Sequence, residues 1–490
     1  MSQVAARRPL RFVILGAGMS GILAAIRLRK EGHTDITIYE KADRLGGTWR
    51  ENTYPGIACD VPAHLYTYSF EPNPGWSRML APGPEIQDYF ERTTDRYGVR
   101  PLIRFGEEVT SCVFDDSRWT LETAGGTRDQ ADVVIAATGV LHHPRIPQLP
   151  GLETFEGAFF HSARWDHGVP LDGRRVGVIG TGSTAIQITS ALSRRVAKYC
   201  LFQRTAQWVF PMENPYYTDE EKARFGSDPA CVEQTREKLN TMMIEGIANA
   251  VIDADSPAMK AIEDACLQNL EQNVRDPVLK EKLRPNYRAG CKRLIISPDF
   301  YDAIQQPSAE VVTEGIARIE PRGVRTEDGR LHELDVLIAA TGFHADRFVR
   351  PTVVRGRNGL DLDHAWAAKP TAYLSVAIPG FPNLFLLNGP NGPVGNFSLI
   401  QVAEFQLDYI LQLVERLRDG SRREIRVKPD VAAAYEARRV EAAKKSIWST
   451  GCNSWYLDAQ GVPASWPWTF AKYAETMARP EMSAFEEEAR

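Results

Sequence analysis

The sequence predicts an α/β protein with two doubly wound dinucleotide-binding (Rossmann-like) domains, the second inserted in the first. The first observation is a strand-like apolar run, 10–15, that leads into a glycine turn, 16–21, and then into helix-forming residues. A second strand follows and ends at Glu40. The second observation is that strand, glycine turn, helix and strand recur in the same order from 174 to 204.

A second internal repeat suggests how the two domains are connected. The segment 132–139, Asp-Val-Val-Ile-Ala-Ala-Thr-Gly, nearly repeats at 335–342. We interpret the first copy as the exit from the first domain and the second copy as the return to it. The expected organisation is 1–145 for the first part of the first domain, 146–334 for the second domain with a helical insertion at about 213–290, 335–478 for the second part of the first domain, and a disordered acidic tail at 479–490.

The composition narrows the partners and the environment of the protein. The 490 residues carry 58 Lys and Arg against 63 Asp and Glu, a net charge of −5, which gives no reason to expect nucleic acid or an anionic membrane as a partner. No apolar run reaches the roughly 18 residues of a membrane span. The seven cysteines are scattered and form no C-x-x-C pair. This favours a reducing cytoplasm and argues against a dithiol reductase and against a metal site.

The first glycine turn has the features of a dinucleotide site. Gly16 permits the tight turn, Gly18 lets a pyrophosphate approach the backbone, and Gly21 lets helix and strand pack closely. Glu40 lies 19 residues after Gly21, where a carboxylate accepts hydrogen bonds from ribose hydroxyls. The plainer alternative is a purely structural turn.

The second glycine turn differs from the first at the position that reads the ribose. Arg204 follows Gly180 at the same spacing, 24 residues, at which Glu40 follows Gly16. An arginine there pairs with a 2′-phosphate, and Thr205 adds a hydrogen-bond donor, so this site should prefer NADPH. The alternative is that Arg204 is a solvated surface cation. The remaining candidate contacts at this site are Gly180, Thr181, Gly182, Ser183, Thr184 and Gln187.

Two dinucleotide sites in one chain imply electron transfer between two cofactors. One carrier is NADPH, and the other is most plausibly FAD, since two nicotinamides would achieve little. Without a C-x-x-C pair to accept electrons, the remaining acceptors are O2 or an external molecule.

At this point the chain resembles the type I Baeyer–Villiger monooxygenases, over about residues 10 to 475. The most specific element is the fingerprint F-x-G-x-x-x-H-x-x-x-W-[PD], which this chain matches at every fixed position just before the second glycine turn. Its fixed residues here are Phe155, Gly157, His161, Trp165 and Asp166. Further matching segments are Gly46-Gly47-Thr48-Trp49, Tyr54-Pro55-Gly56 with Cys59-Asp60, and Cys291-Lys292-Arg293. The segment Ser454-Trp455-Tyr456 is similar to the aryl-ketone (4-hydroxyacetophenone monooxygenase-like) branch.

The resemblance implies a reaction and roles for named residues. A small ketone and O2 would be converted to an ester or lactone through a C4a-peroxyflavin, with FAD and NADPH as cofactors. Arg293 would supply the permanent positive charge that keeps the peroxide anionic, because arginine does not lose its proton. Asp60 would orient Arg293, and Lys292 would reach the 2′-phosphate beside Arg204. The resemblance places Gly47, Thr48, Trp49 and Tyr66 near the flavin.

Several alternatives remain open from the sequence. His161 is interpreted as a linker residue that fixes how the domains meet, rather than as a general base, because the attack on a ketone needs no histidine base. The same scaffold serves oxygenases of amines and thioethers, and an uncoupled NADPH oxidase or reductase is a further alternative. The particular ketone and the oligomeric state are not predicted.

Overall fold

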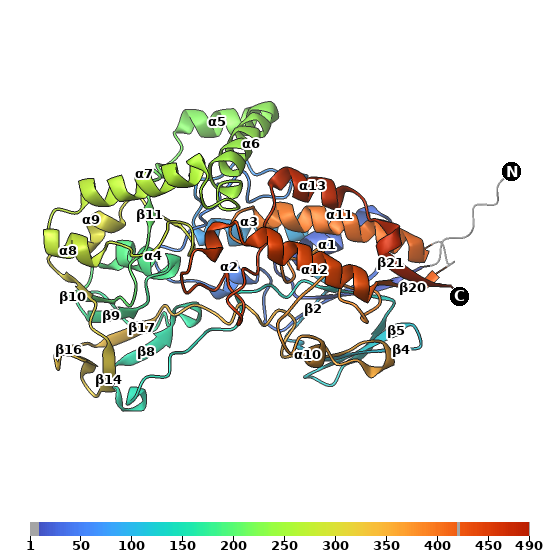
Figure 1. Ribbon diagram of the computed structural model, residues 1–490, viewed down its shortest axis with the longest axis horizontal. Helices are drawn as coiled ribbons and strands as arrows, with labels where there is room; N and C mark the ends of the chain where they lie inside the picture. Colours follow the sequence, from blue (N-terminus) through green and yellow to red (C-terminus); the bar gives the residue numbers. More distant parts are fainter. Residues whose placement is uncertain (1–8, 419–421, 490) are drawn as a thin grey trace.

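The computed structural model describes residues 9–418 and 422–489. Two five-stranded parallel sheets lie toward opposite ends of an elongated molecule, and the last described strand, β21, lies at the end that holds the first sheet (Figure 1). The first sheet has the order β19-β7-β1-β2-β3, and the second has the order β13-β10-β9-β17-β8. The first sheet comprises β1 (Arg11–Leu15), β2 (Asp35–Glu40), β3 (Ile103–Phe105), β7 (Val133–Ala136) and β19 (Leu384–Leu386). The second comprises β8 (Ala158–His161), β9 (Arg175–Ile179), β10 (Lys198–Phe202), β13 (Ala309–Val312) and β17 (Val336–Ala339).

The two sheets are built alike, and both confirm the predicted fold class. In each, the first strand is followed by a glycine turn and a helix, α1 (Met19–Lys30) or α4 (Ser183–Leu192). Strands β1, β7, β9 and β17 are apolar and almost wholly buried, as expected for parallel strands that are covered on both faces.

A carboxylate also joins the first strand, β1 or β9, to the start of its neighbour, β7 or β17, in each unit. Asp132 accepts from the backbone N–H of Arg11 at 2.9 Å, and Asp335 accepts from that of Arg175 at 2.8 Å.

This equivalence corrects the predicted domain boundary at residue 335. Strand β17 pairs with β9 and β8 in the second sheet, not with the first sheet. The repeated Asp-Val-x-Ile-Ala-Ala-Thr-Gly segments are therefore the corresponding strands of two similar units, β7 and β17. The second unit extends through Ala339, and the chain crosses to the first unit only after Thr341 and Gly342. The two copies of the sequence repeat are the same strand of two similar units. The second copy is therefore part of the second domain and not the return to the first.

Each parallel sheet carries a second layer of strands. Most of these strands precede β7 or β17 in the sequence and pair antiparallel, whereas β18 follows β7 and pairs parallel with β4. In the first unit this layer has the order β18-β4-β5-β6, and in the second it has the order β14-β15-β16. The strands are β4 (Val109–Asp115), β5 (Arg118–Thr123), β6 (Arg128–Ala131), β18 (Val353–Arg355), β14 (Ile316–Glu320), β15 (Gly323–Thr326) and β16 (Leu331–Glu333). Both layers bury apolar side chains against the parallel sheet beneath them.

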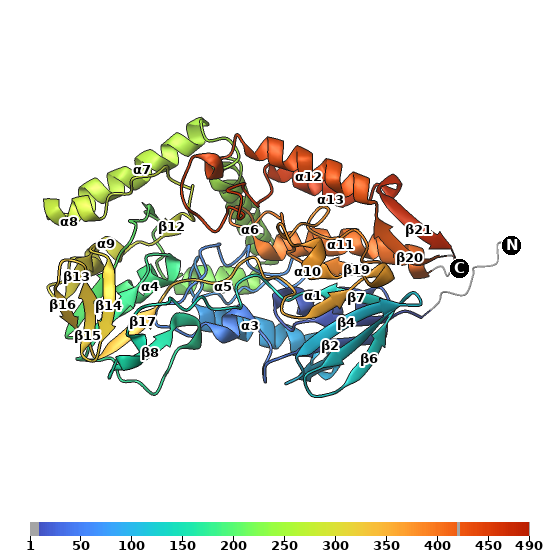
Figure 2. The ribbon, with the colours of Figure 1, turned by 60° about the horizontal axis from the view of Figure 1, so that its bottom comes forward.

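A group of helices lies between β10 and β13 in the sequence, and α7 and α8 of this group form the upper left edge of the molecule in Figure 2. Ser256 begins α7 as a true N-cap, because its hydroxyl accepts from the N–H of Met259 at 3.1 Å. Residues of this insertion share one hydrophobic cluster with Cys291 and with the C-terminal residues Trp448 and Tyr456. The helices are α5 (Asp219–Ser227), α6 (Pro229–Met243), the π-helix η4 (Ile244–Ala248), α7 (Pro257–Asn273) and α8 (Pro277–Lys282), with β11 (Val209–Phe210), β12 (Ile295–Ile296) and α9 (Phe300–Ile304) beside them.

The remaining helices cover the first sheet. Helix α11 (Leu399–Arg418) packs against α1 and against α13 (Phe470–Ala478). The other elements on this side are α2 (Thr48–Glu51), α3 (Gly83–Arg96), α10 (Leu362–Ala365), α12 (Pro429–Ala443), β20 (Arg422–Val427) and β21 (Phe485–Ala489), with short 3₁₀ turns at Arg100–Leu102, Leu152–Thr154, Ser162–Arg164, Arg357–Gly359, Ile447–Ser449 and Met482–Ala484.

The acidic tail is ordered through residue 489, so the prediction of disorder was wrong there. Its strand β21 pairs antiparallel with β20. The acidic side chains meet arginines of β20 and α11: Glu486 bonds Arg426 of β20 at 2.8 Å, and Glu487 bonds Arg416 of α11 at 2.9 Å. A run of glutamates is disordered when its charges are unopposed, and here a basic partner strand opposes them. Residue 490 lies outside the described residues.

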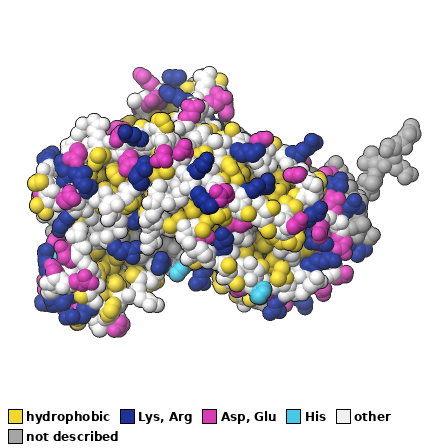
Figure 3. Space-filling view, viewed as in Figure 1, with side chains coloured by type: hydrophobic (Ala, Val, Ile, Leu, Met, Phe, Trp, Pro, Cys, Tyr) yellow, Lys and Arg dark blue, Asp and Glu magenta, His cyan; other side chains and the backbone are white. Residues whose placement is uncertain are grey.

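Acidic and basic side chains are interspersed over the visible face of the molecule (Figure 3), in line with the nearly balanced composition. Among the described helices, none combines the length and the apolar character needed to cross a bilayer.

Candidate active site

The first glycine turn has the geometry that a dinucleotide phosphate needs. Gly16 has φ +100°, and a Cβ on Gly21 would lie only 1.9 Å from the carbonyl oxygen of Gly16, so helix α1 can approach strand β1 this closely only without a side chain. Gly18 precedes α1 and provides no side-chain cap. The first N–H groups of the helix therefore point outward for an anionic group.

Glu40 lies beside this turn, as predicted from its spacing. Its carboxylate is only 5 % exposed and accepts from the N–H of Ala17 at 2.8 Å and from that of Ala42 at 2.9 Å. Each oxygen has further acceptor capacity, so the group fits a ribose hydroxyl at the end of β2.

The segment 46–49 lies against the first turn. The N–H of Gly46 donates to Ala17 O at 2.9 Å, and a Cβ on Gly18 would lie 3.6 Å from the Cα of Gly47. The Trp49 indole N–H donates to the hydroxyl of Tyr66 at 3.2 Å, and burial raises the pKa of that phenol. Thr48 is exposed at the start of α2. The residues that the resemblance assigned to flavin thus gather at one end of the first sheet.

The second glycine turn repeats the design at α4. Gly180 has φ +119°, and Gly182 precedes the helix without a side-chain cap. The hydroxyl of Thr181 donates to the carbonyl of Thr205 at 2.8 Å, which ties the turn to the end of β10. Ser183 and Thr184 follow as the first, partly exposed residues of α4.

A hollow of about 740 Å³ lies beside this turn. Arg204 and Thr205 line it together with Lys282 and Arg284. Arg204 is exposed. The pKa of Lys292 is lowered mainly by the burial of Lys292 and further by the positive charge of Arg204. A hollow lined by Arg204, Lys282 and Arg284 fits an NADPH 2′-phosphate better than a free ribose hydroxyl.

Gln187 was predicted to contact the second dinucleotide, but its side chain bonds residues of the first domain. Its amide oxygen accepts from the hydroxyl of Tyr54 at 2.8 Å, and its amide nitrogen donates to Ala58 O at 3.0 Å. Tyr54 and Ala58 belong to the first domain's loop before Asp60. The side chain of Gln187 therefore joins helix α4 to the first domain.

Arg293 and Asp60 form an ion pair that joins the two units. Arg293 Nε and Nη2 donate to Asp60 Oδ2 and Oδ1 at 2.8 and 2.6 Å, a bidentate arrangement. The charge of Asp60, opposed by burial, raises the pKa of Arg293. The two side chains are 33 % and 22 % exposed, so the pair is accessible to a small molecule while remaining partly desolvated. The predicted proximity of these residues is therefore present.

Tyr456 completes this group, and sequence reasoning did not give it a role. The residue is 4 % exposed, and its phenol interacts electrostatically with the Arg293 guanidinium. The hydroxyl also touches Gly395, where a Cβ would lie 2.0 Å away. The only advance signal was the Ser454-Trp455-Tyr456 segment itself, which says nothing of what the tyrosine contacts.

A disulfide between Cys291 and Cys452 links the two segments that carry Arg293 and Tyr456. The sequence analysis, which favoured a reducing cytoplasm from the scattered cysteines, did not predict this disulfide. The partners are 161 residues apart, so their spacing carried no signal. The other five cysteines are unpaired and buried.

The fingerprint residues lie where the chain crosses between the units. His161 is buried; its Nδ1 accepts from the N–H of Ala163 at 3.1 Å, so Nε2 carries the proton and donates to Gly342 O at 3.1 Å. Burial lowers the pKa of His161. Neither ring nitrogen is left for a proton-transfer role. His161 therefore connects β8 to the crossing segment.

The other fingerprint residues shape the same region. A Cβ on Gly157 would meet Asp335 O at 2.4 Å and the Phe155 ring at 2.6 Å, so only glycine fits there. The Trp165 ring packs edge-on against Phe160 with centroids 5.1 Å apart. Asp166 accepts from the N–H of Gly168 at 2.8 Å and closes a turn.

The chain is similar to known flavin monooxygenases over nearly its whole length. Residues 10–220 match the family described as flavin-binding monooxygenase-like. An uncharacterized monooxygenase of Mycobacterium tuberculosis is 48 % identical over 467 residues, which cover 95 % of this chain and 93 % of the relative. A Baeyer–Villiger monooxygenase of Streptomyces coelicolor is 38 % identical over 485 residues, 97 % of this chain and 92 % of the relative. The structure of cyclohexanone monooxygenase from Rhodococcus sp. Phi1 bound to NADP+ matches with a TM-score of 0.88 at 31 % identity, covering 98 % of this chain and 99 % of that one.

Two dinucleotide folds joined by a bidentate Arg–Asp pair define a flavoprotein oxidoreductase that works with two nucleotide cofactors. With the relatives above, the chain belongs to the flavin-binding monooxygenase family, in its Baeyer–Villiger class. FAD and NADPH are the cofactors of this monooxygenase, and both glycine turns have the geometry for them.

Proposed function

We propose that the protein inserts one atom of O2 beside the carbonyl of a ketone. The reaction consumes ketone, O2, NADPH and a proton, and it yields an ester or lactone, NADP+ and water. The observation that carries the proposal is the Arg293–Asp60 pair, a permanent cation held between the two dinucleotide folds and accessible to small molecules. The Baeyer–Villiger monooxygenases among the relatives support it.

The two turns divide the cofactors between them. FAD occupies the first fold, with its pyrophosphate at Gly16, Gly18 and the start of α1 and its ribose at Glu40. NADPH occupies the second fold, with its 2′-phosphate at Arg204, Thr205 and Lys292. The free N–H groups of α1 and α4 and the opposite charges of Glu40 and Arg204 support this division. Bound FAD, once reduced by NADPH, supplies the activation of O2.

Arg293 stabilises the negative charge on the oxygen that is transferred. A guanidinium stays charged at every physiological pH, whereas a lysine in a partly buried site can lose its proton. The Asp60 carboxylate holds the guanidinium plane in one orientation through two parallel hydrogen bonds. Asp60 also tempers the positive charge. Both residues are therefore assigned to the reaction centre, with Asp60 acting through Arg293.

The crossing segment acts as the coupling between the domains. His161 donates to Gly342 O, and the backbone N–H of Arg145 donates to the same carbonyl at 2.9 Å. The segment that leaves the first domain and the segment that returns to it therefore meet at Gly342. We assign His161 to domain coupling rather than to proton transfer. Reduction by NADPH and oxygen transfer need different groups beside the flavin, which a rotation at this crossing allows.

The surroundings of the cation pair favour an aryl ketone. Trp455 is 42 % exposed and stacks on Tyr456 with ring centroids 4.3 Å apart. An exposed aromatic face one residue from the hydroxyl that contacts Arg293 suits a flat aromatic substrate. This supports the aryl-ketone branch suggested by Ser454-Trp455-Tyr456.

Incubation with NADPH, ¹⁸O2 and a panel of acetophenones, cyclic ketones, thioethers and tertiary amines tests the proposed function. We expect one labelled oxygen in an ester, and faster conversion of the acetophenones. A labelled sulfoxide or N-oxide without any ester would assign the protein to heteroatom oxygenation. Hydrogen peroxide as the sole product across the panel would assign it to the NADPH oxidases.

We expect Tyr456→Phe to lower kcat/KM for ketone about tenfold to a hundredfold, because a polar interaction with a charged group contributes about 1.5–3 kcal/mol. The guanidinium keeps both bonds to Asp60 but loses the partner that fixes its other edge. More NADPH should then yield hydrogen peroxide instead of ester, whereas the KM for NADPH should not change. Product and peroxide yields per NADPH measure this.

Tyr435→Phe is the matched control for that variant. Tyr435 is equally buried, lies on α12, and its hydroxyl has no hydrogen-bond partner. It should leave the yield of ester per NADPH unchanged. Equal yields in Tyr456→Phe and the native protein would show that Tyr456 only packs.

A further inference from the structure

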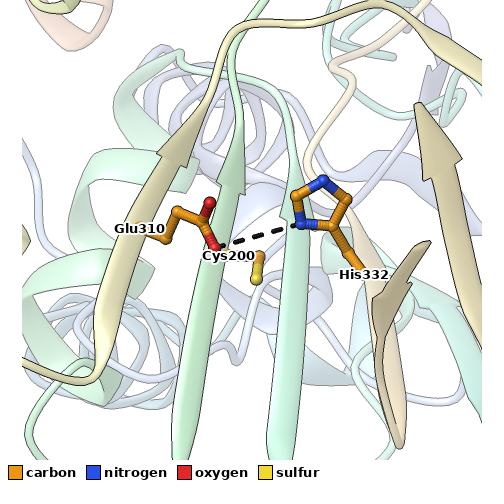
Figure 4. Close-up of side chains that lie close together, drawn as sticks. All are labelled: Cys200, Glu310 and His332. Carbon is orange, nitrogen blue, oxygen red and sulfur yellow. Dashed lines mark ion pairs between the residues drawn. The ribbon is translucent and has the colours of Figure 1, made fainter. Parts of the chain in front are cut away.

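A cluster of three metal-ligating side chains lies in the second unit, away from the Arg293–Asp60 pair. Cys200 on β10 and Glu310 on β13 are direct partners in the parallel register. His332 reaches them from β16 of the overlying antiparallel layer (Figure 4). One ligand atom of each, the thiol sulfur, a carboxylate oxygen and an imidazole nitrogen, lies within 4.8 Å of the other two. The scattered positions explain why the sequence predicted no metal site.

The imidazole of His332 presents an unpaired acceptor to this cluster. Its side chain is 2 % exposed, and its Nδ1 has no hydrogen-bond partner. Its Nε2 lies 3.3 Å from the hydroxyl of Thr326, and that hydroxyl donates its single proton to Asp328 at 2.6 Å. Thr326 therefore accepts from Nε2–H, which leaves a lone pair on Nδ1. A hydrogen bond from the far ring nitrogen in this way fixes the tautomer and the orientation of a metal-binding histidine.

The lone pair of Nδ1 points at another acceptor. The nearest carboxylate oxygen, Glu310 Oε2, lies 4.0 Å away. A buried imidazole nitrogen and a partly exposed carboxylate oxygen that face each other across this gap are both acceptors, and a cation between them would satisfy both. Cys200 supplies a third donor atom at the same place, and its side chain is fully buried. The gap therefore has the donors and the separation of a cation site.

Both oxygens of Glu310 accept from Arg330, so a bound ion would share the carboxylate with this arginine. Arg330 pairs with Glu310 from the surface and is itself half exposed, and Lys198 Nζ lies 3.8 Å from Oε2. Such surface pairs contribute little to stability, about 0–1 kcal/mol, so the cost of sharing the carboxylate is small. Arg330 and Lys198 cover the cluster, which lies just below the surface.

We propose that Cys200, Glu310 and His332 bind a divalent zinc-like ion. Thiolate, imidazole and carboxylate together are the ligands that Zn²⁺ takes, and three protein ligands leave a fourth position for water. With bonds of about 2.0–2.3 Å, the ligand atoms must draw together by roughly 1 Å from their present separations. The ion would join β10, β13 and β16, and it would thereby clamp the antiparallel layer onto the second parallel sheet.

Metal titration of the full-length holoenzyme tests this proposal. The protein is freed of metal with a chelator and then titrated with Zn²⁺ alone, and in parallel with Co²⁺, whose visible bands report a four-coordinate thiolate site. We expect one ion per chain and a melting temperature that rises by several degrees with added Zn²⁺. Cys200→Ser, His332→Gln and Glu310→Gln should each weaken binding by at least about tenfold to a hundredfold.

Cys112→Ser is the matched control, because Cys112 is an equally buried strand cysteine outside the cluster. It should bind Zn²⁺ as the native protein does. Glu310 lies at the surface, so Glu310→Gln retains the fold even if the two buried replacements do not. Absence of stoichiometric binding, or binding that Glu310→Gln leaves unchanged, would overturn the proposal. Ester formation need not change in either case, so this outcome is independent of the proposed function.

Discussion

Arg293→Met is expected to lower ester formation by about a hundredfold to a thousandfold while NADPH oxidation continues. Removing one preorganised donor from a developing oxyanion has an effect of this size. The guanidinium is the charge nearest to Asp60 and Tyr456, and methionine fills a similar volume without a charge. Hydride transfer takes place at the two nucleotide folds, which the substitution leaves intact. NADPH consumption should therefore appear almost wholly as hydrogen peroxide.

Two further variants separate charge from structure in this experiment. Arg288→Met removes an arginine five residues earlier, whose guanidinium bonds Glu263 at 2.8 Å, and it should leave ester formation unchanged. Arg293→Lys keeps a positive charge but loses the bidentate pairing, so an intermediate yield is expected. Ester yields in Arg293→Met equal to those of the native protein, at equal FAD content, would refute the assigned role of the cation.

Local rules predicted much of this site from the sequence. The glycine turns, their helices and the acid or arginine at the end of the following strand obey short spacings, because one turn, one helix and one strand set them. Glu40 and Arg204 were located in this way, and both lie beside their turns in the structure. The position of Arg293 against Asp60 followed from the resemblance, since 233 residues separate the two.

Contacts between distant segments could not be predicted in the same way. The disulfide partner of Cys291, the contact of Tyr456 with Arg293, and the approach of His332 to Cys200 all depend on how one layer packs on another. No spacing in the chain encodes such packing. The acidic tail shows the same limit, because its glutamates are stabilised by arginines of β20 and α11 that lie about 60 or more residues earlier.

The charge at Arg204 should decide between the two nicotinamide cofactors. We expect Arg204→Gln to raise the KM for NADPH about tenfold to a hundredfold and to leave the KM for NADH nearly unchanged. A hydrogen bond between a charged donor and a phosphate contributes about 1.5–3 kcal/mol to binding. NADH has no 2′-phosphate, so its binding does not depend on this bond. Steady-state kinetics with both cofactors, at fixed ketone, measure the ratio.

Salt dependence gives an independent test of the same charge. In the native protein the KM for NADPH should rise with ionic strength, because Arg204 is exposed and its attraction for the 2′-phosphate is screened. Arg204→Gln should flatten that dependence. Arg194→Gln is the control, since Arg194 lies on the same domain but is paired with Asp302 outside the hollow. A change in NADPH preference in the control alone, or in neither variant, would show that Arg204 is a solvated surface cation, and the discrimination would then fall to Lys292 and Thr205.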